Sequence, residues 1–220
     1  MNIHQNTTVG EVAAAMPGVL PVFQELKIDF CCGGKKPLMD ALNERGASVD
    51  GFLELVEAQQ AARRSGAGTQ DFSQMNPAAL TRYIEDTHHG YLRHALPEID
   101  EMLLLVLKAH GGNHPELFEV YKLFGRLKAD LSQHLVKEEA LLFPALSQSA
   151  EAGALAAEIV NEHEGAGKLL EAMRGASFDY AVPADACMSY QTVYALLPEM
   201  ESDLHQHIHL ENNILMKGLA

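Results

Sequence analysis

The chain has 220 residues, of which 30 are acidic and 16 basic, giving a formal net charge of −14. This charge repels phosphate backbones and anionic lipid headgroups, which argues against nucleic acid and membrane surfaces as partners. A secretory signal and a run of about 20 apolar residues are both missing, and only three cysteines occur, so we expect a cytoplasmic protein without a membrane segment.

The first 60 residues predict a few short helices. Pro17-Gly18 and Cys32-Gly33-Gly34 interrupt the apolar pattern, and both residue types end helices because they disfavour helix interiors. We therefore expect a small helical domain over residues 1–61. The stretch that follows is polar and glycine-rich, as flexible connectors are, and residues 62–75 are predicted to be a linker.

Four long segments with apolar residues at helical spacing follow the linker. A capping side chain and a proline at Asn76-Pro77 mark the start of the first segment. We expect the first and fourth helices to kink at Pro97 and Pro198 without ending there. Short connections favour an antiparallel, up-down four-helix bundle over residues 76–220 in an all-α protein. The predicted helices cover about 76–109, 115–147, 151–174 and 184–217.

The second predicted helix carries a histidine and a glutamate on its apolar face. At about 100° per residue, His134 and Glu138 point the same way as Leu131 and Leu141. A buried, ionised glutamate is unfavourable unless it is paired or binds a metal. This His-x-x-x-Glu pair is therefore a candidate ligand pair.

The third and fourth helices add histidines of the same kind. His207 and Glu211 repeat the His-x-x-x-Glu spacing on the apolar face of the fourth helix, whereas His205 and His209 project to the opposite side. On the third helix, His163 lies on the apolar face. Two such motifs and a further histidine favour a metal-binding role over a purely structural one.

The first helix offers two adjacent histidines, and periodicity leaves the choice between them open. His88 lies nearer than His89 to the centre of the apolar face formed by Ile84, Ile99 and Val106. We count residues from the end of the bundle where the first helix begins and the second helix ends. The histidines of all four helices lie about 10–13 residues from that end, which is about 15–20 Å at 1.5 Å per residue. The four helices therefore bring their histidines to one level.

Four imidazoles and two carboxylates at one level predict a two-metal site. Nitrogen and oxygen ligands on facing helices, with no cysteine nearby, suit iron or manganese, and zinc is also compatible with these ligand types. The remaining histidines are expected in loops or facing solvent: His4, His94, His110 and His114.

Cys31 and Cys32 are adjacent and follow a predicted helix. One interpretation is a pair of partly exposed thiols, because the positive charges of Lys35 and Lys36 favour thiolates. The alternative is a pair of small residues at a helix end. Cys187 is expected to be a packed small side chain.

These residues resemble the repair-of-iron-centres family, which comprises hemerythrin-like di-iron proteins of the YtfE, ScdA and DnrN type. The resemblance covers nearly the whole chain. Residues 29–35, Asp-Phe-Cys-Cys-Gly-Gly-Lys, look like the family's short cysteine-bearing domain. The stretches that look like its ligand blocks, in the same order, are residues 88–97, 134–139, 161–164 and 207–213.

The resemblance implies a specific ligand set. Alignment at Leu96-Pro97-Glu98 selects His89, not His88, as the ligand of the first helix. The family then implies that Glu138 and Glu211 bridge two iron ions, which also share an oxo or hydroxo bridge. The terminal ligands implied are His89, His134, His163 and His207.

The resemblance also implies a function. The expected activity is repair of iron–sulfur clusters damaged by nitrosative or oxidative stress, with iron donated from a labile site to damaged or apo iron–sulfur proteins. It favours a thiol role for Cys31 and Cys32. Two alternatives stay open: an enzyme that reduces NO to N₂O, and a hemerythrin-like carrier or sensor of O₂ or NO. The oligomeric state is also open, a homodimer included.

Overall fold

The structure is a computed structural model that describes residues 3–4, 6–31, 33–64, 72–146, 149–217 and 219. Over these residues it is helical, and its one β-type pairing is an isolated bridge between Thr8 and Pro37. The all-α prediction is confirmed. Residues 65–71 of the predicted linker lie outside the described residues, as does Cys32.

The chain divides into two compact units. The amino-terminal unit comprises Met1–Leu80 with His205–Gly218, and the bundle unit comprises Thr81–Leu204 with Leu219–Ala220. The predicted boundaries at 61 and 76 stay a prediction. No helix in the described ranges is long and apolar enough to cross a membrane.

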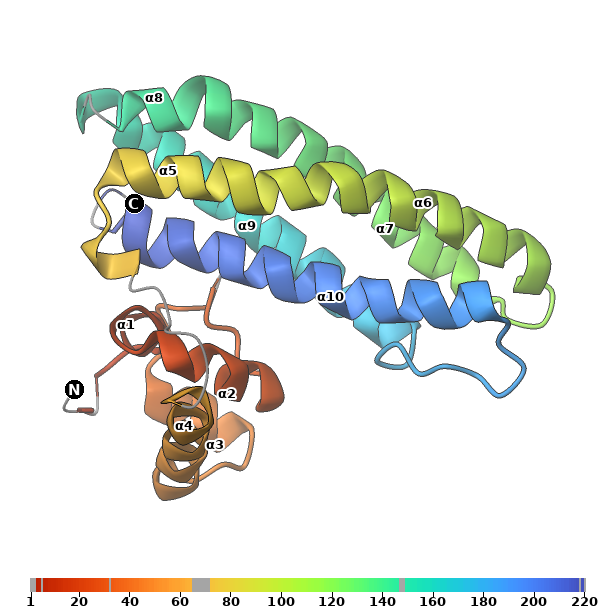
Figure 1. The fold of residues 1–220 in the computed structure, drawn as a ribbon, viewed down its shortest axis with the longest axis horizontal. Helices are drawn as coiled ribbons and strands as arrows, with labels where there is room; N and C mark the ends of the chain where they lie inside the picture. Colours follow the sequence, from red (N-terminus) through yellow and green to blue (C-terminus); the bar gives the residue numbers. More distant parts are fainter. Residues whose placement is uncertain are drawn as a thin grey trace. The chain divides into compact units, whose positions relative to one another are not determined.

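The amino-terminal unit consists of short helices around an aromatic core. Thr8 opens α1 with a capping box, because its side chain accepts from Glu11 and Glu11 bonds back to the Thr8 backbone. Phe23 stacks on Phe30 and Phe52, with ring centroids 6.0 and 5.5 Å away. The helices, drawn in red to orange in Figure 1, are α1 (Val9–Ala15), η1 (Pro17–Val19), α2 (Leu20–Glu25), α3 (Leu38–Glu44) and α4 (Val49–Arg64).

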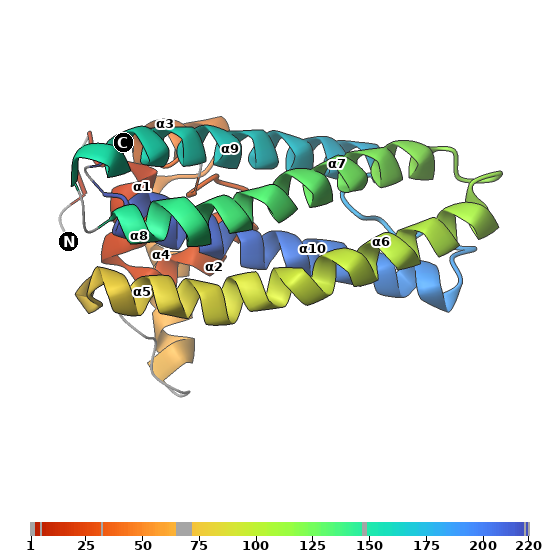
Figure 2. The same ribbon diagram turned by 90° about the horizontal axis from the view of Figure 1, so that it is seen from above.

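The bundle is built from four long helices, which confirms the predicted up-down four-helix architecture. In Figures 1 and 2, α6, α7, α9 and α10 run along a common direction. In chain order the elements from residue 72 on are η2 (Phe72–Gln74), α5 (Pro77–Ile84), η3 (Glu85–His89), α6 (Gly90–His110), α7 (Glu116–Lys137), η4 (Glu138–Leu142), α8 (Phe143–Ala145), α9 (Ser149–Ala176), α10 (Met188–Leu210) and η5 (Glu211–Leu215).

Three of the helical rods contain a π turn, in η3, η4 and η5. A π turn closes i→i+5 hydrogen bonds and so adds one residue to the turn, which rotates the following residues relative to a regular α-helix. Leu141, predicted to be buried from a 100° projection, is 52% exposed for this reason. Within η3, both His88 and His89 are buried.

The helix ends differ from the predicted ones at two places. The fourth helix begins at Met188, not at residue 184, because Ala186 donates to the Pro183 carbonyl in a turn. The third helix ends at Ala176, and the left-handed backbone of Phe178–Tyr180 then reverses the chain. Helices α6 and α10 continue through Pro97 and Pro198, as expected.

Candidate metal centre

The six predicted ligand side chains are all buried. Each of the six residues is at most 3% exposed, although glutamates are almost never fully buried unless they are paired. They come from six elements. Three lie in π turns: His89 ends η3, Glu138 opens η4 directly after the last turn of α7, and Glu211 opens η5. The histidines of the regular helices are His134 in α7, His163 in α9 and His207 in α10.

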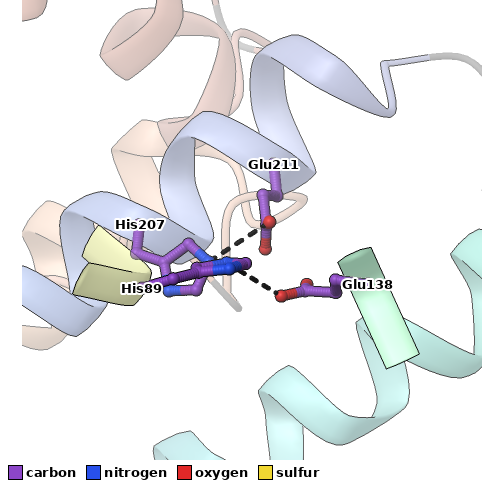
Figure 3. A group of neighbouring side chains, drawn as sticks. All are labelled: His89, Glu138, His207 and Glu211. Carbon is purple, nitrogen blue, oxygen red and sulfur yellow. Dashed lines mark ion pairs between the residues drawn. The ribbon is translucent and has the colours of Figure 1, made fainter. Parts of the chain in front are cut away.

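Their ligand atoms form two overlapping sets. The first set is His89, Glu138, His207 and Glu211. In both sets the ligand atoms lie within 4.8 Å of one another. Figure 3 shows the first set, with the two imidazoles and the two carboxylates directed toward one another. The second set replaces the two histidines by His134 and His163, and it keeps both glutamates. Each carboxylate is therefore common to both sets.

All four histidines of the sets direct their Nε2 atom at a glutamate oxygen. The distances to a Glu138 oxygen are 3.3 Å from His89, 3.0 Å from His134 and 3.7 Å from His163. Nε2 of His207 lies 3.2 Å from Oε1 of Glu211. The Nε2 atoms of His134 and His163 lie 3.0 Å apart, which is close enough for both to serve one ion. Within each set, the histidine nitrogens and glutamate oxygens therefore point toward the same small region, where an ion could bind.

The charge state of Glu138 fits a cation. Its burial alone would raise the pKa, but the charge and hydrogen bond of His134, with hydrogen bonds from His163 and His89, hold the pKa of Glu138 well below its usual value. Glu138 and Glu211 are both fully buried. Buried carboxylates in a chain of net charge −14 need positive charge nearby, and imidazole nitrogens with carboxylate oxygens suit iron. The residues therefore fit a metal-binding site.

Two glutamates that the sequence reasoning missed face the outer nitrogens of the histidines. Nδ1 of His89 lies 2.7 Å from Oε1 of Glu139, and Nδ1 of His134 lies 2.7 Å from Oε2 of Glu162. The only signal for them in the sequence is adjacency, since each of them neighbours a predicted ligand. Because a residue next to an inward one points sideways on a helix, periodicity gave no reason to select them.

His88 is buried but belongs to neither set. Its Nδ1 atom lies 2.9 Å from Oδ1 of Asp203, and its ring makes an edge contact with Tyr83 at 5.8 Å between centroids. The ligand sets contain His89 in its place.

His209, expected on the side opposite His207 and Glu211, belongs to neither ligand set, and it is buried. It is 2% exposed and lies in the amino-terminal unit, where its ring contacts Phe30 edge-on at 5.8 Å. Its Nδ1 atom lies 3.0 Å from Nδ2 of Asn213. Burial lowers the pKa of His209 to about 4, so the ring packs as a neutral aromatic group. The face opposite the ligands is therefore also a packed face.

The environment of Cys31 also differs from the predicted one. Its side chain is only 3% exposed, and Sγ donates to Oδ1 of Asp29 at 3.3 Å. The same carboxylate accepts from the backbone of Cys31 and of Gly33. Lys36 is paired with Glu44 at 2.6 Å. The interpretation of Cys31 as a partly exposed thiol is thus wrong, because its side chain is buried against Asp29.

Two asparagines that follow Glu211 hold the cysteine segment. Asn212 donates to the Cys31 carbonyl at 3.1 Å, and Asn213 donates to the Phe30 carbonyl at 3.0 Å. Gly10 packs closely against Asn213: a Cβ atom at position 10 would lie 2.3 Å from Oδ1 of Asn213, and this side chain would have to shift. All of these residues belong to the amino-terminal unit.

Cys187 is exposed, which corrects the expectation of a packed side chain. It immediately precedes the first residue of α10, where the chain has not yet joined the bundle packing.

Comparison with known proteins finds similarity over both parts of the chain. Residues 81–219 match the hemerythrin HHE cation-binding domain, and residues 5–60 match a domain of unknown function, ScdA_N. The iron–sulfur cluster repair protein YtfE of Pectobacterium carotovorum is 35% identical over 96% of each chain. The repair protein ScdA of Staphylococcus epidermidis is 28% identical over 99% of this chain and 100% of its own, and YtfE of Yersinia pseudotuberculosis is 30% identical over 96% of each.

Proposed function

Because the chain belongs to the family of iron–sulfur cluster repair proteins with a carboxyl-terminal hemerythrin HHE domain, we propose that it restores iron–sulfur clusters damaged by nitrosative or oxidative stress. Its site binds metal, and the proposed cargo is two iron ions that pass to damaged or apo iron–sulfur proteins. The proposed compartment is the reducing cytoplasm, which the small number of cysteines favours.

One observation carries this proposal: Glu138 and Glu211 each belong to both ligand sets. Two carboxylates with four oxygens in total can serve two neighbouring ions, whereas one ion would leave the second pair of histidines without a role. The proposed ligands of one ion are His89 and His207, and those of the other are His134 and His163. Both ions share the two glutamates.

The ligand set also favours release of the cargo. Iron prefers about six donors, so two ions offer about twelve positions. Four histidines would fill four of them and two shared glutamates another four, which leaves about four positions open. Sulfur ligands of an acceptor protein could reach the iron through those open positions. Glu138 and Glu211 are the anions among the six residues, so they balance part of the ions' charge. A change at either glutamate should weaken both ion positions.

The test uses anaerobic protein loaded with ferrous iron and freed of excess iron on a desalting column. We expect about two iron ions per chain in the wild type, and fewer than one in Glu138→Gln and Glu211→Gln. Addition of an apo iron–sulfur protein, sulfide and a mild one-electron oxidant, which takes up the electrons lost as part of the ferrous iron becomes ferric, should then restore the visible absorption of the acceptor's cluster. Glu164→Gln is the control, because Glu164 is an exposed glutamate on α9 and should behave like the wild type.

The same loaded protein separates repair from the alternatives. Restored clusters with wild-type protein and failure with both glutamate variants support the proposal, whereas equal restoration by all the proteins contradicts it. Formation of N₂O over many equivalents of NO, without iron transfer, would assign an NO reductase in its place. Reversible binding of O₂ or NO with full retention of iron would assign a carrier or sensor.

A further inference from the structure

The outer nitrogens of two histidines in the bundle unit are held by carboxylates from neighbouring helices. Glu139 in η4 reaches Nδ1 of His89 in η3, and Glu162 in α9 reaches Nδ1 of His134 in α7, each at 2.7 Å. The two glutamates are 28% and 33% exposed at their side chains. They therefore lie between the buried histidines and the solvent.

Each of these glutamates is tied in turn by a cation. Arg93 places Nη2 2.6 and 2.7 Å from the two oxygens of Glu139. Lys137 pairs with Glu162 and also lies 2.7 Å from Glu158. Each carboxylate therefore has a cation on one side and a histidine nitrogen on the other. The result is two separate chains of the order cation, carboxylate, histidine.

A carboxylate at Nδ1 fixes two properties of a histidine ring. It selects the tautomer in which Nδ1 carries the proton, which leaves the lone pair on Nε2, and it stops the ring from rotating. In His89 and His134, Nε2 is the atom that faces Glu138. Holding the outer edge of the ring thus aims the inner nitrogen at the ligand set.

We propose that Glu139 and Glu162 are positioning residues, and that each controls one of the two ion positions independently. His89 belongs only to the first ligand set and His134 only to the second, whereas Glu138 and Glu211 belong to both. A change at Glu139 therefore loosens one ion and a change at Glu162 loosens the other. This inference rests on the proposed pair of iron ions.

The test measures how fast iron leaves the full-length protein when a coloured ferrous chelator is added in excess. In Glu139→Leu, which keeps the bulk but lacks an acceptor, about half of the iron should leave 10- to 100-fold faster than in the wild type. The other half should leave at the wild-type rate. Glu162→Leu should give the same biphasic result, and the double variant should release all of its iron fast.

Two further variants separate positioning from a general loss of structure. Glu139→Gln keeps an acceptor oxygen and should recover most of the slow phase, whereas Glu164→Leu at an exposed position should release iron as the wild type does. Uniform acceleration of all the iron, or no change in either leucine variant, would overturn the positioning role. If the wild type holds no iron, the proposed function fails as well, so the two failures are distinguishable.

Discussion

His88 and His89 are consecutive residues whose rings have different buried partners. Nδ1 of His88 lies 2.9 Å from Asp203, and Nε2 of His89 lies 3.3 Å from Glu138. Two adjacent residues of an α-helix point about 100° apart, and here both point into the protein because they end the π turn η3. The extra residue of that turn gives the helix a wider buried face.

Substitutions at these two positions should have separable effects. His89→Gln should lower the iron content from about two to about one ion per chain, because the first ligand set loses a nitrogen donor. His88→Gln should keep both ions but lower the free energy of unfolding by about 1–3 kcal/mol, because the buried partner of Asp203 changes. Iron analysis and urea unfolding of the metal-free protein measure the two effects. Loss of iron in His88→Gln with retention in His89→Gln would reverse the assignment.

The contact between Gly10 and Asn213 should appear as a coupling in a double-mutant cycle. Asn213→Ala should cost about 1–2 kcal/mol, because its bonds to the Phe30 carbonyl and to His209 are lost. Gly10→Ala should cost about 1–3 kcal/mol, because the added Cβ would meet Oδ1 of Asn213 at 2.3 Å. The double variant should be less destabilised than the sum by about 1 kcal/mol, since Asn213→Ala removes that oxygen. Strict additivity in urea unfolding would contradict the contact.

The cysteines should differ in their reaction with a thiol reagent. In the folded protein, an alkylating reagent should modify the exposed Cys187 within the first time points and Cys31 much later, because Cys31 is buried against Asp29. In urea the two should react alike. Peptide mass spectrometry of samples quenched over time follows each site, and Cys187→Ser is the control that removes the fast phase. Equal rates under native conditions would disagree with the burial of Cys31.

His114 joins the loop before α7 to the loop before α10. Its Nδ1 atom lies 2.9 Å from Glu116 and its Nε2 atom 3.0 Å from Asp185. The hydrogen bond to Glu116 raises the pKa of His114 above 6.5, burial opposes this, and Asp185 raises it further. The hydrogen bond from His114 in turn lowers the pKa of Asp185 below 3.8. The charged pair is thus favoured in the folded state.

The sign of the pH effect follows from these shifts. The contribution of His114 is complete below its unfolded pKa near 6.5 and is lost as the pH rises through the raised folded value. The contribution of Asp185 is lost only as the pH falls below 3.8. Stability should therefore decline as the pH rises above 6.5, and His114→Gln should flatten this decline. Urea midpoints across this range test it, with the exposed His94→Gln as control.

The sequence alone determined the helical architecture and the residues that gather at the site. Apolar spacing places His134, Glu138 and His163 on inward faces because an α-helix repeats every 3.6 residues, and equal distances along antiparallel helices bring them to one level. All of these side chains are buried in the structure. Local pattern suffices where the helix is regular.

Only the tertiary structure decided the features that depend on contacts between segments far apart in the sequence. Residues in a π turn depart from the 100° rule, so periodicity favoured His88 and misplaced Leu141. The partners of the outer nitrogens of His89 and His134 come from other helices, and helical spacing within one segment carries no information about them. For this reason the carboxylates of Glu139 and Glu162 became visible only when the helices were packed together.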